Sequence, residues 1–574
     1  MTTSYRSLRQ YTKDVELPAG LENFGQFQLS GKIKGTLGDL RANDLVLTTE
    51  AATRFAGDLE VTGLPDIDRT IFNLTINDLT AQSADLNGFS TTPLPPELDS
   101  LGLIQFAGQF NGTIRDFVIN GGFKTDAGNA KTNLKMAFNQ AYSDANYQGK
   151  LSLENFDMGR VLADTSQFGA LTLNLQLNGR GLAIDSLDTA MEGVVNSAIF
   201  NQYEYNDLHV DGHFIQRLFE GKMNMQDENL SFELLGKVNL NDSLPQLDAT
   251  VRIDTINLKS LHFYEEQIGI SGVIKANLKG SNLDNLDGKA NLTNLAVSSE
   301  EQKYFDKKIV LEAKQWKAGS RALFFDSGFL KANIAGRYNF GDLPDLVIGY
   351  INDFFPVEEL TLPPDSLLTP RPDKADQQFD FDFQFTNLTS LVSVFLPDFE
   401  EMDSSAFLRG KFDSADKQLE LAGQFPNIVY QGSQVDSFSL KMNGNRRRLR
   451  TYLKLSNLNF NNTFFAPTLS FNTRLGDDTL RFDLAVQNDS LDYLFKWGGK
   501  ANELPTDYQL VFDKTMVLNE EKWDIDPKNQ LLFDANKLFF QNLIFSKGQQ
   551  VVAINSIDEV QTDDLADGIA VRSF

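Results

Sequence analysis

One short stretch shows the pattern that recurs along the whole chain. Between Gly169 and Gly179, polar residues alternate with four leucines, Leu171, Leu173, Leu175 and Leu177. Successive side chains of a β-strand point to opposite faces, so the stretch predicts a strand with one apolar and one polar face. A helix does not fit, because its apolar residues recur every three or four positions.

The same strand returns as an internal repeat. Two glycines enclose it each time, and the pairs are Gly25 and Gly35, Gly102 and Gly112, Gly169 and Gly179, and Gly269 and Gly280. The glycines of a pair are 10 or 11 positions apart, whereas successive pairs open 67 to 100 positions apart. A regular strand with variable spacing favours hairpins added to one growing sheet over a solenoid of short fixed period.

Only short helices are expected between the strands. Three strands end in an Asn-Phe or Asn-Leu pair, and the sequence after each pair has room for a short helix, at 158–167, 261–267 and 391–396. Frequent Gly, Asn and Asp turns favour antiparallel pairing. At roughly 13 residues per strand and turn, the chain predicts on the order of 40 strands.

The predicted fold class is therefore all-β, a long and mainly antiparallel sheet with a few short helices. Its apolar face must be buried by a second sheet, by helices or by an outside partner. Helices are too few, which leaves a chain of tandem β-sandwiches or a curved single sheet whose groove is filled by acyl chains. Burial of an acyl chain is worth about 0.8 kcal/mol per methylene.

The repeats suggest a division of the chain into five parts. Proline-rich interruptions separate three blocks of strands, and a polar segment ends the chain. The predicted parts are strand repeats over 1–92, 93–355 and 379–557, a proline-rich loop over 356–378 and a polar tail over 558–574.

Composition excludes several classes of function. The 574 residues include 78 acidic and 52 basic ones, a net charge of −26, which argues against a nucleic-acid binder and against docking on anionic lipids by a basic face. Cysteine is absent, so disulfides and thiolate chemistry are excluded. The sequence shows no apolar run of about 18 residues and no signal-peptide core near Met1, so we expect a cytosolic protein or part of a longer chain.

Candidate chemistry is sparse. The histidines are His209, His213 and His262, and the first two could share one face of a strand, but polar surface positions fit them better than a metal pair. No nucleotide-binding, nucleophile or calcium-loop motif is present, so we expect no enzyme, no catalytic residue, no metal and no cofactor. The basic cluster Arg446–Arg450 follows Asn443-Gly444 and predicts a charged hairpin turn, with contact to a lipid head group or an acidic partner as the alternative.

The chain also resembles a known family. The run from Asn277 to Leu295, Asn-Leu-Lys-Gly-Ser-Asn-Leu-Asp-Asn-Leu-Asp-Gly-Lys-Ala-Asn-Leu-Thr-Asn-Leu, looks like the repeat of the TamB group of the AsmA-like proteins. The strand, Asn-Phe or Asn-Leu pair and short helix at Asn155-Phe156, Asn257-Leu258 and Asn387-Leu388 are similar to the Bacteroidetes members. The resemblance runs from about residue 20 to 555 and rests on pattern, without a catalytic signature.

This resemblance implies a curved, twisted and taco-shaped hydrophobic groove in the periplasm of a Gram-negative bacterium. The implied function is bridge-like transport of phospholipids between the inner and outer membranes, with a role in outer-membrane biogenesis. An N-terminal inner-membrane helix and a partner-binding domain are not found in the sequence, so the resemblance implies an internal fragment, attached to the membrane through regions outside it.

Two other functions stay open. One is a component of a translocation and assembly module, which acts on outer-membrane proteins with a BamA-like or TamA-like barrel partner. The other is an adhesin or scaffold of tandem β-sandwiches. Phospholipid acyl chains are the expected ligand of the groove, and the residues expected to line it, which form ordinary core in the alternative, are Leu171, Leu173, Leu175, Leu177, Ile270, Ile274, Leu278, Phe379, Phe381, Phe383 and Phe385.

Overall fold

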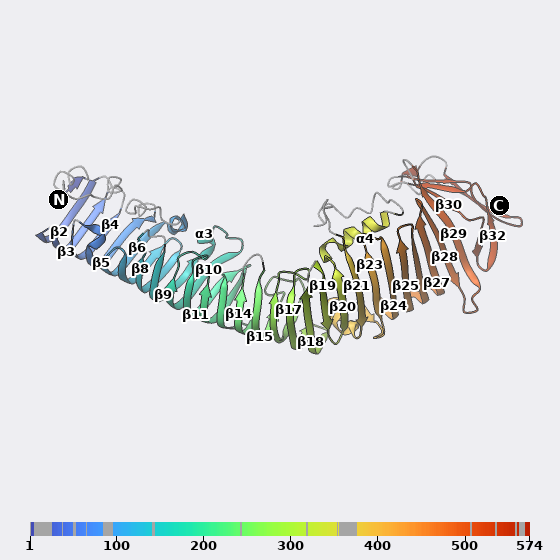
Figure 1. The fold of residues 1–574 in the computed structure, drawn as a ribbon. Helices are drawn as coiled ribbons and strands as arrows, with labels where there is room; N and C mark the ends of the chain where they lie inside the picture. The colour runs from blue at the N-terminus through green and yellow to red at the C-terminus, as the bar shows by residue number, and fades with distance from the viewer. Residues whose placement is uncertain are drawn as a thin grey trace. The chain divides into compact units, whose positions relative to one another are not determined.

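The chain forms one long, open antiparallel sheet with few short helices (Figure 1). The computed structural model describes residues 2–4, 26–36, 38–49, 53–64, 66–83, 96–140, 144–240, 244–316, 319–352, 354, 376–504, 508–533, 537–556, 560–561 and 569–573. Strands take up 70% of the structure and helices 7%, and 38 strands belong to the sheet. The predicted fold class is confirmed, and the described residues do not form a row of closed sandwiches.

The chain divides into two units, residues 1–277 and 278–574, which are described separately. The short helices of unit 1 are η2 (Ile67–Arg69), η3 (Pro96–Leu101) and α3 (Met158–Leu162). Its strands are β1 (Thr2–Ser4), β2 (Gln26–Thr36), β3 (Asp39–Thr49), β4 (Arg54–Thr62), β5 (Ile71–Gln82), β6 (Leu103–Gly112), β7 (Asp116–Thr125), β8 (Gly128–Phe138), β9 (Ala145–Asp157), β10 (Phe168–Arg180), β11 (Asp188–Phe200), β12 (Tyr203–Ile215), β13 (Leu218–Gln226), β14 (Leu230–Asn239) and β15 (Gln246–Asn257).

Unit 1 is a meander. From β1 to β15, each strand pairs antiparallel with the next strand along the chain. Pairing of sequence neighbours needs only short turns, which the frequent Gly, Asn and Asp residues supply. The strand β16 (Gly269–Lys279) contains residues of both units.

Unit 2 continues with longer connections. Its helices are η5 (Phe340–Asp342), α4 (Leu343–Asn352) and α5 (Leu388–Phe395). Its strands are β17 (Asp287–Ser298), β18 (Lys303–Gln315), β19 (Arg321–Asp326), β20 (Leu330–Arg337), β21 (Gln378–Phe385), β22 (Phe399–Glu401), β23 (Phe407–Asp413), β24 (Gln418–Tyr430), β25 (Ser433–Asn445), β26 (Arg448–Phe460), β27 (Phe464–Gly476), β28 (Thr479–Gln487), β29 (Tyr493–Glu503), β30 (Tyr508–Phe512), β31 (Thr515–Leu518), β32 (Glu521–Ile525), β33 (Gln530–Phe533), β34 (Lys537–Gln541), β35 (Leu543–Lys547), β36 (Gln550–Ser556), β37 (Val560–Gln561) and β38 (Ile569–Ser573).

The sheet of unit 2 forks near its end. Strands β17 to β29 pair antiparallel in chain order, except that β21 pairs with β23 while the short β22 pairs with β24. Strand β29 then pairs with both β30 and β31, and each begins a separate branch. One branch continues through β33, β34 and β37, the other through β32, β35, β36 and β38.

Two of the three predicted helices are present. Helix α3 lies within 158–167, and α5 covers most of 391–396 and begins earlier. The helix predicted over 261–267 is wrong, because the chain turns there with His262 at φ +60° and Phe263 largely exposed. Helix α4 was not predicted, although Pro344 in its first turn and apolar residues at helical spacing are typical of a helix start.

The predicted loop and tail are described only in part. Most of the proline-rich loop at 356–378 lies outside the described residues. Only its last three positions, 376–378, are described, and the last of them, Gln378, begins β21. Within 558–574 the structure describes two short strands, β37 and β38.

Candidate functional site

The apolar side chains of unit 1 line up in rows that run across the strands. Paired residues of neighbouring strands point to the same face, so the printed register defines each row. The row through Leu175 crosses β5 to β15 and contains one polar residue, Thr132. Its members are Ile76, Gly108, Gly121, Thr132, Leu151, Leu175, Gly193, Val210, Met223, Leu234 and Val251.

This face has no extensive cover in the described part of unit 1. Strands β11 to β14 lie against their two sheet neighbours, and β10 additionally contacts α3 near one end (Figure 1). On β10, Leu173 is 8% exposed while Leu171, Leu175 and Leu177 are half-buried. Neighbours within a single layer therefore shield these leucines partly, as the alternating pattern of the sequence predicts.

Glycines show that the apolar face is the inner side of the local bend. A Cβ atom at Gly193 would lie 2.1 Å from the Asn174 carbonyl oxygen, and one at Gly149 would lie 2.0 Å from the Asn133 carbonyl oxygen. Both residues have φ near +150°, which glycine adopts readily. Gly122 points to the polar face, where an added Cβ would come no closer than 3.9 Å to another atom. Glycine kinks of this kind bend a sheet.

Unit 2 carries a corresponding apolar row. It crosses β17 to β29 and passes through Phe383, one of the predicted lining residues. Its members are Ala290, Leu311, Phe325, Ala332, Phe383, Leu408, Gly423, Leu440, Leu453, Phe471, Leu484 and Trp497.

Parts of this second face are covered by the protein itself. Helix α4 places Tyr350 over one end of the strands, where Phe379 and Phe412 join it in a buried cluster. A second cluster joins Phe512 of β30 to Trp497 at a ring-centroid distance of 4.2 Å. Side chains of the protein itself therefore cover the apolar face beneath α4 and at the fork of the sheet.

The predicted lining residues fall into two groups, those on open parts of the apolar face and those in or against the protein's own core. Leu171, Leu173, Leu175 and Leu177 share the apolar face of β10, and Ile270, Ile274 and Leu278 occupy half-buried positions of β16 that are four residues apart. Phe379 is 8% exposed and lies in the protein's own core, so the prediction that it lines an open groove is not supported. Phe381 packs against that core, whereas Phe383 and Phe385 are half-buried farther from α4.

Sequence reasoning missed much of the row in unit 1. Val210, Met223 and Leu234 lie on it, but a glycine interrupts the apolar positions of each of their strands. These glycines are Gly212, Gly221 and Gly236. The turns between β12, β13 and β14 would have aligned these residues, because a hairpin turn fixes the register of its two strands.

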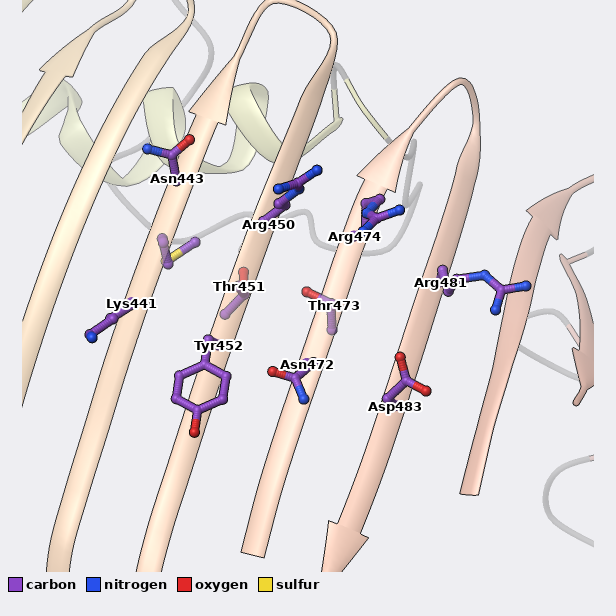
Figure 2. Close-up of a pocket in the computed structure, with 11 residues that line it drawn as sticks. Lys441, Asn443, Arg450, Thr451, Tyr452, Asn472, Thr473, Arg474, Arg481 and Asp483 are labelled. Carbon is purple, nitrogen blue, oxygen red and sulfur yellow. The ribbon is translucent and has the colours of Figure 1, made fainter. Parts of the chain in front are cut away.

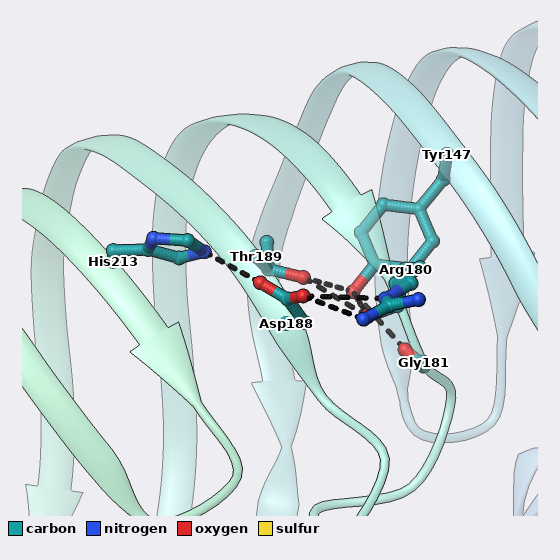
Figure 3. Close-up of polar contacts among 6 residues, drawn as sticks. All are labelled: Tyr147, Arg180, Gly181, Asp188, Thr189 and His213. Atoms are coloured by element: carbon teal, nitrogen blue, oxygen red, sulfur yellow. Dashed lines mark hydrogen bonds and ion pairs between the residues drawn. The ribbon is translucent and has the colours of Figure 1, made fainter.

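A polar network ties four strands of unit 1 together (Figure 3). The Asp188 carboxylate lies 2.7 Å from His213 Nε2 and 3.0 Å from an Arg180 guanidinium nitrogen, and Tyr147 bonds to Thr189 and to the Gly181 carbonyl oxygen. The hydrogen bond with His213 holds the pKa of Asp188 below its usual 3.8. These contacts join the neighbouring strands β9, β10, β11 and β12.

The structure places two of the histidines on β12 and the basic cluster at the turn between β25 and β26. His209 and His213 lie four positions apart on β12, and the described residues hold no group of three or more potential metal ligands. Arg446 and Arg447 form the turn between β25 and β26, which confirms the predicted charged hairpin turn. Arg446 pairs with Asp416 at 2.7 Å.

Replacing Asp227 with asparagine is expected to destabilise the turn between β13 and β14. Burial raises the pKa of Asp227, but hydrogen bonds from Tyr203, Asn229 and Asn206 outweigh it and leave the pKa below 3.8. The ionised form therefore contributes stability above about pH 4, which is lost as the pH falls through the lowered pKa. Urea unfolding at pH 7 should show a loss of about 1 to 2 kcal/mol in Asp227→Asn. An equally large difference at pH 2.5 would contradict this explanation.

No family model, curated protein or solved structure matches the chain. Among the described helices, none has the length and apolar character needed to cross a membrane.

Proposed function

We propose that this protein is a hydrophobic conduit for phospholipids between the inner and outer membranes of a Gram-negative envelope. Acyl chains would lie on the apolar face while their head groups stay in water. The observation that carries the proposal is the apolar row across β5 to β15, which has no extensive cover in the described residues. The resemblance of the repeats to the TamB group supports the same function.

Continuity of the row matters energetically. Neighbouring strands are about 4.8 Å apart, which corresponds to about four methylenes of an extended acyl chain. At about 0.8 kcal/mol per methylene, one strand without apolar side chains would leave roughly 3 kcal/mol of burial unrealised. Where the row has glycines on β6 and β7, other side chains on the same face of these strands, Phe106 and Phe110 on β6 and Ile119 and Phe123 on β7, keep the surface apolar. Each of the eleven strands therefore presents apolar side chains to this face, so a lipid can move along it with small changes in free energy.

Site-specific photo-crosslinking tests this proposal. A benzophenone amino acid replaces Leu175 on the apolar face or, as the matched control, Gln176 on the polar face of the same strand. After incubation with phospholipid vesicles and illumination, mass spectrometry should find lipid adducts at 175 and few at 176. Position 379 gives a second control, because Phe379 is buried beneath α4 and should form few adducts. Equal labelling at 175 and 176, or none at either, would contradict a lipid-binding face.

A further inference from the structure

On several pairs of neighbouring strands, charges of opposite sign face each other on the polar face. Lys237 of β14 lies 2.9 Å from Glu220 of β13, and Lys289 of β17 lies 3.3 Å from Glu312 of β18. Opposite charges on facing strands stabilise a sheet, whereas like charges that face each other destabilise it. A departure from alternation in a chain of net charge −26 therefore needs a physical reason.

One row of unit 2 departs from alternation. It runs across the polar face in the order Ala335, Asp380, Lys411, Glu420, Asn443, Arg450, Arg474, Arg481 and Lys500. Signs alternate up to Glu420, and Lys411 pairs with Asp380 at 3.9 Å. From Arg450 onward, four basic residues face one another on consecutive strands, β26 to β29.

Two of these arginines have no ion-pair partner among the described residues. Arg481 has Asp513 at 3.6 Å, and Asp483 lies two positions along the same strand. For Arg450 and Arg474, the structure gives no ion pair or hydrogen bond of the guanidinium group within its described residues, and both residues are exposed. Their positive charge is thus available to an outside anion.

The arginines border a cleft of about 360 Å³ (Figure 2). Arg450, Arg474 and Arg481 stand side by side on neighbouring strands, with Asn443 beside Arg450. Asp483, two positions from Arg481 on β28, also lines the cleft and would repel an anion from its own position. The volume exceeds that of a single phosphate, and the arginines on adjacent strands are about 4.8 Å apart along the sheet.

We propose that this cleft binds a phosphate-class anion, held mainly between the guanidinium groups of Arg450 and Arg474. The planar guanidinium fork donates two parallel hydrogen bonds to phosphate oxygens, which a lysine cannot do. A diphosphate fits the spacing, because each of its two phosphoryl groups can meet its own arginine, and the single phosphoryl group of a phosphate ester can accept hydrogen bonds from both. The site lies on the polar face and does not depend on the proposed lipid-binding face.

Calorimetric titration with pyrophosphate tests the site. The double variant Arg450→Gln/Arg474→Gln should bind at least tenfold more weakly than the unaltered protein. The matched control is Arg252→Gln in β15, because Arg252 also lies on a polar strand face but pairs with Glu233 at 2.7 Å. Equal affinity in the unaltered protein and the double variant, or an equal loss in the control, would overturn the proposal.

A stability measurement gives an independent readout. In phosphate-free buffer of low ionic strength, Arg474→Gln should melt at a higher temperature than the unaltered protein, because one repelling charge is removed. Pyrophosphate should raise the melting temperature of the unaltered protein and leave that of the double variant unchanged. A failure of pyrophosphate to raise the melting temperature of the unaltered protein would count against the site.

Vesicle flotation distinguishes the source of the phosphate. Phosphatidylglycerol vesicles carry the same chemistry in a lipid head group, and phosphatidylcholine vesicles are the control without net charge. Weaker flotation of the double variant with phosphatidylglycerol identifies a head group, whereas loss of pyrophosphate binding alone identifies a free phosphate. The crosslinking test at Leu175 probes the apolar face, whereas the phosphate site lies on the polar face. The lipid-conduit proposal and the phosphate-site proposal can therefore fail independently of each other.

Discussion

Leu175→Asp is expected to slow lipid transfer between vesicles by roughly 100-fold while the sheet stays folded. A carboxylate within an apolar lipid environment costs about 2.5 to 3.5 kcal/mol, and about 1.4 kcal/mol corresponds to a factor of ten. Leu175 occupies the middle of the apolar positions of β10, between Leu151 and Gly193. Total bound lipid should fall much less than the transfer rate, because one polar position interrupts the row without removing its other members.

The matched control is Gln176→Asp, which adds the same charge to the polar face of the same strand. It should transfer lipid at the rate of the unaltered protein. The double variant Leu175→Asp/Leu177→Asp should transfer lipid more slowly than Leu175→Asp alone. Circular dichroism and thermal melting establish that the variants are folded. If Leu175→Asp unfolds the protein, the position is core, and if it folds and transfers lipid normally, the conduit proposal fails.

Gly121→Ala is expected to lower the free energy of unfolding of β6 and β7 by about 2 to 3 kcal/mol, because the added methyl group overpacks the crowded side of the sheet. An added Cβ would lie 2.4 Å from the Ala107 carbonyl oxygen and 2.7 Å from the Phe106 ring. Two of the nearest atoms belong to backbone that is fixed by strand pairing, so they cannot move away cheaply. Hydrogen exchange of the 574-residue chain should show faster opening of the amides in β6 and β7.

Gly122→Ala is the neighbouring control on the same strand. Its Cβ would point to the polar face, where the nearest atom is 3.9 Å away, so the stability should change by no more than about 0.5 kcal/mol. Equal effects of the two substitutions would contradict the assignment of the apolar face to the inside of the bend.

Some features of the candidate sites were within reach of the sequence. Leucine at every second position of 171–177 required one apolar face, and Arg446-Arg447 lay where a hairpin turn was expected. Arg474 and Arg481 are equally far from the Asp477-Asp478 turn, so a two-residue hairpin places them opposite each other. Arg450 aligns with them only through a separate turn, and no pattern near Arg450 predicts that alignment.

The sequence pattern did not distinguish the covered parts of the apolar face from the uncovered parts. Phe379 and Phe383 have the same alternation within one strand, yet the first lies beneath α4 and the second does not. The difference comes from Tyr350, about 30 positions earlier in the chain, whose ring lies 5.8 Å from that of Phe412. A local pattern contains no information about such a contact.

The sequence alone determined that this protein is built from antiparallel strands with one apolar and one polar face, because strand alternation is a local property with a period of two. Only the tertiary structure decided which apolar residues are covered by α4 and by the fork at β29, and which polar residues of four strands face one another. Both depend on strand register and on packing between distant segments, and a shift of one residue in register would exchange the two faces.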